Sequence, residues 1–162
     1  MVYTTTVESP IGPLTLTSEE GWLTGVHMAD QAHAPVRAPG WVEDPTPFSR
    51  AAEQLEAYFA GELTAFDLPL RLKGTDFQRS VWRGLCAIPY GETISYAELA
   101  RWVGNAKACR AVGLANGRNP VAVIVPCHRV IAAGGGLGGY GGGLDRKSWL
   151  LSHEAAVRTG RR

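Results

Sequence analysis

The chain has 162 residues, of which 45% are hydrophobic and 19% charged, and its formal net charge is +1. That length suits one compact unit or two small ones, and the apolar content is too high for intrinsic disorder. No apolar run approaches the roughly 20 residues of a membrane span, and no secretory signal is visible. Three cysteines without a CxxC pair argue against a disulfide framework and a structural zinc site. We therefore expect a soluble, cytoplasmic protein that binds no metal.

The charge is divided unevenly at Gly74. Residues 1–74 hold four basic and ten acidic side chains, a net of −6, whereas residues 75–162 hold twelve and five, a net of +7. Chance scatter of solvated charges would explain this division. A basic half is also typical of a protein that meets a polyanion, with nucleic acid as the first candidate. The charge alone does not decide whether residues 1–74 and 75–162 are two domains.

The first half is predicted to combine a small sheet with one helix. Three segments rich in β-branched residues and separated by turns predict an antiparallel meander, at 2–8, 14–18 and 21–29. Residues 30–46 show no periodicity and are predicted to form a loop. Apolar residues at helical spacing then predict a helix that begins at Thr46-Pro47 and ends at Gly61.

The second half is predicted to be mostly helical. The segments TDFQ at 75–78 and SYAE at 95–98 match capping boxes, and each should open a helix. Another helix is predicted over 105–117, which gives the spacing of a helix-turn-helix. The apolar run at 121–125 predicts a buried strand, and the last helix is predicted over 145–157.

Cys127 is the strongest candidate for chemistry. It follows the apolar run and directly precedes His128 and Arg129. Cationic neighbours lower the pKa of a thiol, and the thiolate is the nucleophilic form. An isolated cysteine is more often a small buried hydrophobe, which is our interpretation of Cys86 and, less clearly, of Cys109.

His128 would act on Cys127 through a bridging water, because adjacent residues rarely share a hydrogen bond. By the logic of a catalytic triad, a carboxylate is then needed to orient the imidazole. Glu154 on the last helix is the best-placed candidate, and Asp145 is the other.

A run of glycines separates Cys127 from the last helix. Eight of the ten residues at 134–143 are glycine. Such a run is usually a flexible linker, but here glycine would also let the backbone approach a ligand closely. The run lacks the GKS/T of a P-loop, so we exclude phosphate binding.

Several strings of this sequence together closely resemble the O6-alkylguanine-DNA alkyltransferases. The strings are SPIGPLTL, ISYAELA, KACRAVGLANGRNP, NPVAVIVPCHRVI and GLGGYGGGLDRKSWLLSHE. The resemblance covers essentially the whole chain, and PCHRV followed by a glycine-rich YxGG segment is highly specific. It implies an α/β (α+β) fold, with a small ribonuclease-H-like N-terminal domain that contains an antiparallel sheet. That domain would span residues 1–74, and a mostly helical, winged helix-turn-helix domain that binds DNA and holds the active site would follow over residues 75–162.

The resemblance also implies a reaction. An alkyl group, such as methyl, would pass from the O6 atom of guanine in double-stranded DNA to Cys127, after the nucleotide is flipped out of the duplex. The transfer would be irreversible, would occur once per molecule and would need no cofactor. The protein would act as a monomer; clustering along DNA and activity on O4-alkylthymine are left open.

The functional residues of the family carry over position by position. Cys127 would be the nucleophile, His128 its water-mediated base and Glu154 the residue that orients His128. Asn119 would tie the end of the recognition helix to the active-site loop. Tyr96 would donate to guanine N3 as the base leaves, and would favour flipping by crowding the phosphate.

Arg110 would enter the base stack and fill the space that the flipped nucleotide leaves. Other expected DNA contacts are Tyr96, Asn105, Lys107, Ala111 and Gly113. The expected lining of the alkylguanine pocket is Val130, Gly138, Tyr140, Gly141 and Lys147. The carbonyl groups of Cys127 and Val130 would accept from the guanine amino group.

Three features of the sequence depart from parts of the family. The zinc site of some members is not expected, because no cysteine precedes Cys86. Cys109 stands where alanine is usual, and Gly141 stands where some members carry serine, so one side-chain contact to O6 would be missing. The tail RTGRR at 158–162 is expected either to fray or to add a phosphate contact.

Two other functions compete with alkyl transfer. One is a non-catalytic lesion binder, but such relatives carry tryptophan at the cysteine position, where this chain has Cys127. The other is a Cys-His hydrolase, which would need an oxyanion hole that nothing in the sequence marks.

Overall fold

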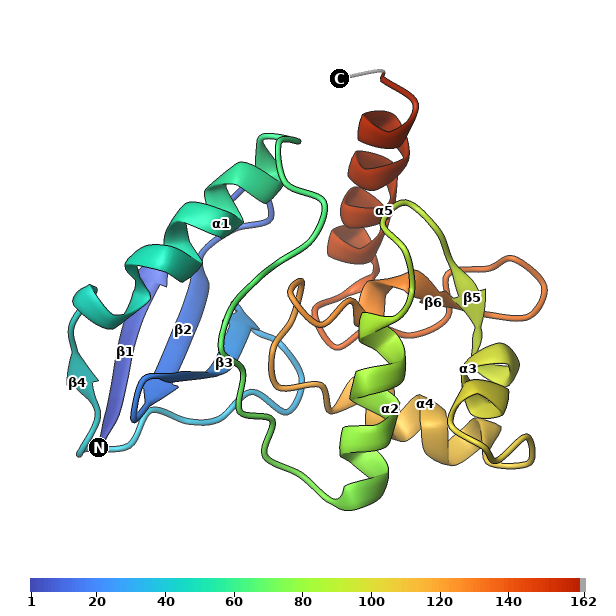
Figure 1. Cartoon of the computed structure of the whole chain (residues 1–162), viewed down its shortest axis with the longest axis horizontal. Coiled ribbons are helices and arrows are strands. Elements are labelled where there is room, and N and C mark those ends of the chain that lie inside the picture. The colour runs from blue at the N-terminus through green and yellow to red at the C-terminus, as the bar shows by residue number, and fades with distance from the viewer. Residues whose placement is uncertain (161–162) are drawn as a thin grey trace.

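The structure is a computed structural model that describes residues 1–160 (Figure 1). Arg161 and Arg162, the basic end of the predicted tail, lie outside the described residues. A sheet covered by helix α1 occupies the left of Figure 1, and the helices of the second half occupy the right. No helix among residues 1–160 is long and apolar enough to cross a membrane.

Strands β1 (Val2–Val7), β2 (Leu14–Glu19) and β3 (Trp22–Met28) form the predicted antiparallel meander. The fourth strand, β4 (Val42–Glu43), pairs parallel with β1, so the order is β3-β2-β1-β4 and the sheet is mixed rather than purely antiparallel. The prediction of a loop throughout 30–46 is therefore wrong at β4. Two residues are too few to produce the alternation by which a strand is recognised.

Helix α1 (Ser49–Phe59) follows the short 3₁₀ turn η1 (Thr46–Phe48), which confirms the predicted helix. Its buried face includes Leu55 and Tyr58, each almost fully removed from solvent.

The second half begins with α2 (Asp76–Cys86), and the predicted capping box at its start is complete: Thr75 Oγ1 accepts from the Gln78 amide, and Gln78 Oε1 accepts from the Thr75 amide, both at 3.0 Å. Helix α3 (Tyr96–Trp102) has only half of its predicted box. Ser95 accepts from the Glu98 amide, but the Glu98 carboxylate accepts from Arg101 and Trp102 instead.

Helix α4 (Cys109–Gly117) is the second helix of the helix-turn-helix, and it starts four residues later than predicted. Gly104 ends α3 with a φ of +83°, and the Asn105 amide still donates to the Ala100 carbonyl. The Ala108 amide donates back to Asn105, so residues 105–108 form the turn between the helices.

The apolar run at 121–125 is buried but is not the predicted strand. Only Val121 makes a bridge, to Val26, and Val123 has a φ of +70°, which is unusual for a β-branched residue. A short apolar run indicates burial, and it does not distinguish a strand from another buried conformation. The turn η2 (Cys127–Arg129) follows.

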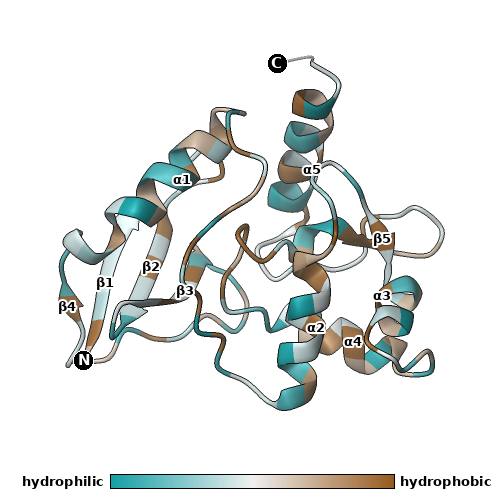
Figure 2. Ribbon diagram, viewed as in Figure 1, coloured by the Kyte–Doolittle hydropathy of each residue, from teal (hydrophilic) through white to brown (hydrophobic). Residues whose placement is uncertain are grey.

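Two elements complete the second half. β6 (Val130–Ile131) pairs parallel with β5 (Ile94–Ser95), and the last helix is α5 (Leu144–Arg158). The buried apolar residues of both halves form one continuous core, and Figure 2 shows hydrophobic segments gathered where the two halves meet.

Candidate active site

Cys127 is the buried cysteine of the chain, whereas Cys86 and Cys109 are exposed. The interpretation as a buried hydrophobe is therefore wrong for Cys86 and also for Cys109. Cys86 is the last residue of α2 and follows Leu85, which faces the core, so its own side chain is turned away from the core.

Asn119 holds the strained segment that precedes Cys127. Its side-chain amide donates to the Val125 carbonyl at 2.8 Å, and its side-chain oxygen accepts from the Val121 amide at 3.0 Å. These contacts satisfy backbone groups that a neighbouring strand would otherwise satisfy, and they bracket Val123 with its positive φ. Strained backbone persists only where surrounding contacts hold it in place, and the side chain of Asn119 provides two such contacts here.

Glu154 on α5 brings the groups after Cys127 into one buried cluster. Its Oε2 lies 2.7 Å from His128 Nε2, and its Oε1 accepts from Arg129 Nε at 2.8 Å. Arg129 also donates to the Ile88 carbonyl at 2.8 Å. Asp145, the alternative to Glu154, is exposed in the first turn of α5.

The ionisation states follow from this cluster. Burial alone would raise the pKa of Glu154, but His128 and Arg129 outweigh it and hold that pKa well below its usual range. Burial lowers the pKa of His128, which is therefore neutral near pH 7. Because the Glu154 carboxylate only accepts, Nε2 carries the imidazole proton and Nδ1 presents a lone pair. Nδ1 is buried and has no hydrogen-bond partner among residues 1–160.

The surroundings of Cys127 do not favour its thiolate form. Burial raises the pKa of Cys127, and Asn119, Lys147 and Tyr140 oppose the shift without cancelling it. The expectation that cationic neighbours lower this pKa is wrong for the adjacent residues, because Arg129 points to Glu154. A protonated thiol needs a base, and His128 with its free Nδ1 lies next to it in the chain.

Lys147 is fully buried beneath the glycine run. Its ammonium donates to the Val130 carbonyl at 2.6 Å and to the Gly139 carbonyl at 3.1 Å. The Tyr96 hydroxyl also points to Gly139, at 3.5 Å. Burial raises the pKa of Tyr96, so this hydroxyl stays protonated and able to donate.

Part of the glycine run is packed too closely to be a flexible linker. A Cβ at Gly138, whose φ is +70°, would lie 3.0 Å from the Tyr96 hydroxyl, and a Cβ at Gly142 would lie 2.3 Å from the Met28 sulfur. These two positions therefore require glycine for close approach, as one of the two sequence interpretations expects.

A pocket opens beside α4 and continues to the thiol. Tyr96, Gly113, Tyr140 and Gly141 line its outer part, and Tyr140, Gly141 and Cys127 line a cavity of about 10 Å³ below it. Val130, Gly138 and Lys147 support these walls but are not among the lining residues.

The sequence interpretation missed two contributors to this pocket. Asn116 lines both of its parts and donates to the Cys127 carbonyl at 3.4 Å, while its side-chain oxygen is buried without a partner among the described residues. Residues 31–33 of the first half cover the pocket, and the Ala32 amide donates to the Gly141 carbonyl at 2.9 Å. Neither has a local sequence signal, because each acts through contacts distant in the chain.

The predicted DNA contacts lie on and before α4. Arg110, Ala111, Asn105 and Lys107 are exposed, and Gly113 is partly covered by Tyr96. Arg110 lies in the first turn of α4 and forms no ion pair within residues 1–160. Leu114, one turn further along, is 70% exposed and was not singled out from the sequence.

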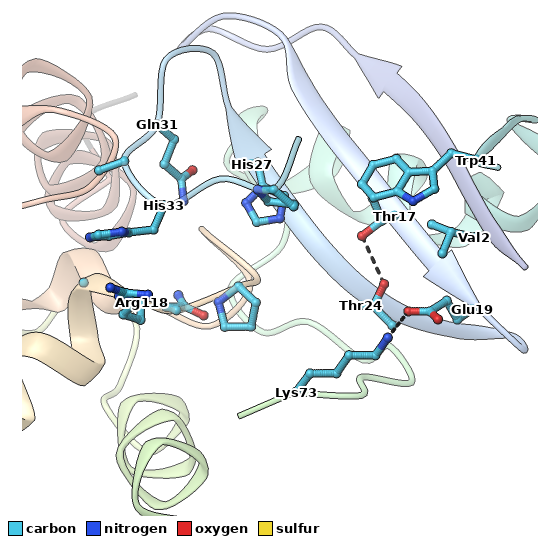
Figure 3. Close-up of a pocket in the computed structure, with 15 residues that line it drawn as sticks. Val2, Thr17, Glu19, Thr24, His27, Gln31, His33, Trp41, Lys73 and Arg118 are labelled. Atoms are coloured by element: carbon cyan, nitrogen blue, oxygen red, sulfur yellow. Dashed lines mark hydrogen bonds and ion pairs between the residues drawn. The ribbon is translucent and has the colours of Figure 1, made fainter. Parts of the chain in front are cut away.

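A second, larger pocket lies where the sheet meets the end of α4 (Figure 3). Lys73, His27 and Arg118 line it, and Figure 3 shows His27 between Gln31 and Thr17. Its lining includes no cysteine, so we assign the chemistry to the pocket at Cys127. The described residues contain no cluster of three or more His, Cys, Asp or Glu side chains that could hold a metal ion.

Two family models match the chain. The model of the DNA-binding domain of 6-O-methylguanine DNA methyltransferase matches residues 76–156, and that of its ribonuclease-like domain matches residues 1–72. The chain belongs to the 6-O-methylguanine DNA methyltransferase family. The resemblance inferred from the sequence is thereby confirmed, while the domain boundary at residue 74 stays a prediction.

Individual members of this methyltransferase family match over nearly the whole chain. Methylated-DNA–protein-cysteine methyltransferase of Mycolicibacterium paratuberculosis is 59% identical over 154 residues, which are 95% of this chain and 93% of the relative. The protein of that name from Methanosarcina acetivorans is 53% identical over 156 residues, which are 96% and 99%. Mycobacterium tuberculosis OGT, crystallised in complex with DNA, matches with a TM-score of 0.92 at 56% identity, over 96% of this chain and 94% of that chain. The predicted α/β fold of two joined parts is confirmed by this likeness.

Proposed function

We propose that the protein repairs DNA by transferring an alkyl group from guanine O6 directly to Cys127, in one irreversible turnover. The observation that carries this assignment is a buried thiol at the inner end of a pocket, beside a neutral histidine held by an ionised carboxylate. Double-stranded DNA with O6-alkylguanine is the substrate, and membership of the family supports it.

In the reaction, His128 Nδ1 accepts the Cys127 proton through a bridging water, and Glu154 stabilises the imidazolium that forms. The sulfur attacks the alkyl carbon in line, an S–C bond forms and the C–O6 bond breaks. Guanine leaves as an anion with the electron pair of that bond, and the protonated Tyr96 hydroxyl stabilises it by donating a hydrogen bond to N3. The His128 imidazolium returns the thiol proton through solvent, and that proton ends on guanine N1. The products are a thioether and unmodified guanine, so atoms and charge balance without a cofactor.

The exposed face of α4 binds the duplex. Arg110 fills the space that the flipped nucleotide leaves, because a planar guanidinium stacks on bases and donates hydrogen bonds. The basic charge of residues 75–162 supplies the phosphate contacts, so affinity falls steeply with salt. The protein acts as a monomer on each lesion.

One mass measurement tests the assignment. The protein is mixed with duplex DNA that contains O6-methylguanine, and the intact mass is recorded. Alkyl transfer adds one CH₂ unit to each chain, and peptide mapping places it on Cys127. An unchanged mass with bound DNA would indicate a lesion binder, and product without an adduct would indicate a hydrolase; either result would refute the proposal.

A further inference from the structure

Tyr58 brings a polar group from the first half of the chain into the cluster around Glu154. It lies on α1, is fully buried, and its hydroxyl donates to Glu154 Oε2 at 2.6 Å. The Tyr58 carbonyl also accepts from His153 Nε2 at 2.9 Å, so this one residue joins α1 to α5 twice. The reaction proposed above assigns no role to the Tyr58 hydroxyl.

The oxygen that Tyr58 contacts is also the one that serves His128. Glu154 Oε2 lies 2.7 Å from His128 Nε2, and Arg129 Nη2 donates to it at 3.1 Å. Hydrogen bonds to one acceptor compete for its negative charge, and in a dry interior each is electrostatically strong. The bond from Tyr58 therefore weakens the stabilisation that Glu154 gives to a protonated His128.

We propose that Tyr58 is a positioning residue for the alkyl transfer: its hydroxyl binds Oε2 of Glu154 and thereby limits the pull of that carboxylate on the His128 imidazole. The proposal rests on the roles assigned above to Cys127 and His128. The first half of the chain thereby takes part in setting the strength of the base.

Toward the Glu154 carboxylate the Tyr58 hydroxyl can act only as a donor. Burial, followed by the charge of Glu154 and the hydrogen bond to it, raises the pKa of Tyr58 far above its usual value. The other titratable or charged groups that face this cluster are Lys147 and His153 on α5, Arg129 in η2, Tyr90 before β5, and Tyr140 in the glycine run. Substitution of Tyr58 by phenylalanine leaves the charge of each group in place, so the loss of one hydrogen bond is isolated.

The test is Tyr58→Phe, which removes the oxygen and keeps the ring. The rate of alkyl transfer from duplex DNA is measured against pH. Because His128 must be neutral to accept the thiol proton, a better stabilised imidazolium moves the acidic limb of the profile upward, by about half a pH unit or more. The affinity for DNA should not change. Tyr3→Phe, at a half-buried tyrosine of β1, is the matched control and should leave the profile in place.

A second measurement does not depend on alkyl transfer. The ring nitrogens of His128 are titrated by ¹⁵N NMR in the parent and in Tyr58→Phe. An upward shift of the His128 pKa in the variant supports the proposal; if the parent then failed to take up an alkyl group, the proposed function alone would be wrong. A folded variant with an unchanged rate profile and an unchanged His128 titration would overturn the role of Tyr58, even if its stability were lower.

Discussion

The two halves of the molecule use charged side chains in different ways. In the first half, the ion pair of Arg50 with Asp67 is 58% and 92% exposed, and such pairs contribute about 0–1 kcal/mol. In the second half, the pair of Arg129 with Glu154 is 8% and 1% exposed. Breaking a buried pair costs about 3–5 kcal/mol, since the remaining charge is left uncompensated. Both halves carry ion pairs at their surfaces, and the second half adds a buried pair at the candidate active site.

Two parts of the first half nevertheless contact the candidate site in the second half. The network that orients His128 receives one donor from α1, and the wall of the pocket receives residues 31–33. The acidic first half therefore contributes one hydrogen-bond donor and part of the pocket wall to the candidate site in the basic second half. Substitutions in each half separate the effect of buried charge at the site from that of exposed charge elsewhere.

The largest expected effect is that of Cys127→Ser. A serine hydroxyl has a far higher pKa than a thiol and is a much weaker nucleophile, so alkyl transfer should be abolished. The exposed face of α4 with Arg110 is untouched, so the affinity for DNA should stay within about twofold of the parent. Intact mass and gel shift measure the two quantities. An alkyl group found on exposed Cys86 or Cys109 would show that the chemistry is not confined to the buried cluster.

Glu154→Gln should have the next largest effect, on stability. The pKa of Glu154 lies below its usual value of 4.5 in the folded protein, so its ionised form stabilises the fold above that pH, and the stabilisation is lost as the pH falls. At pH 7 the free energy of unfolding should drop by about 3–5 kcal/mol. Its dependence on pH below 4.5 should become flatter, as urea titrations at several pH values would reveal.

The control for Glu154→Gln is Arg50→Gln, which breaks the exposed pair with Asp67. It should change the free energy of unfolding by less than about 1 kcal/mol. Equal effects of the two substitutions would contradict the contrast between the halves.

Arg110→Ala should have a smaller effect, restricted to duplex substrate. Flipping costs a few kcal/mol, and without the guanidinium that cost is not offset, so transfer from duplex DNA should slow by about tenfold or more. Transfer from the free alkylated base needs no flipping and should be nearly unaffected. Arg118→Ala, at the far end of α4, is the control. An unchanged ratio of the two rates in Arg110→Ala would mean that α4 does not face the lesion.

The structural features that could be predicted from the sequence are mainly those that depend on residues close together in the chain. The capping box at Thr75 follows from residues three apart, and its two hydrogen bonds are both present. Glu154 has no such local cause: it is preferred to Asp145 as the best-placed carboxylate on the last helix, and the family resemblance indicates it too. Its Oε2 does lie 2.7 Å from His128 Nε2. Whether these residues act as proposed stays a prediction until the variants are measured.

The parts that the sequence did not predict depend on distant partners. Tyr58 lies 96 positions from Glu154, so no spacing rule could pair them. The conformation at 121–125 depends on the side chain of Asn119, which replaces a neighbouring strand. The exposure of Cys86 depends on where α2 stops relative to its apolar face, which is the least predictable property of a helix.

The smallest expected effect is that of Gly141→Ser, which tests the contact between the halves at the pocket. A Cβ at Gly141 would lie 3.6 Å from the Gly117 carbonyl and 3.7 Å from the Ala32 carbonyl, so the side chain fits. Its hydroxyl could donate to guanine O6 as negative charge develops there, and one such hydrogen bond would raise the transfer rate by a few fold. Gly142→Ser is the matched control, because its Cβ would lie 2.3 Å from the Met28 sulfur and should lower stability by about 1–3 kcal/mol. If Gly141→Ser instead lost stability like Gly142→Ser, the segment at 31–33 would be a rigid wall with no room for a further group beside the substrate.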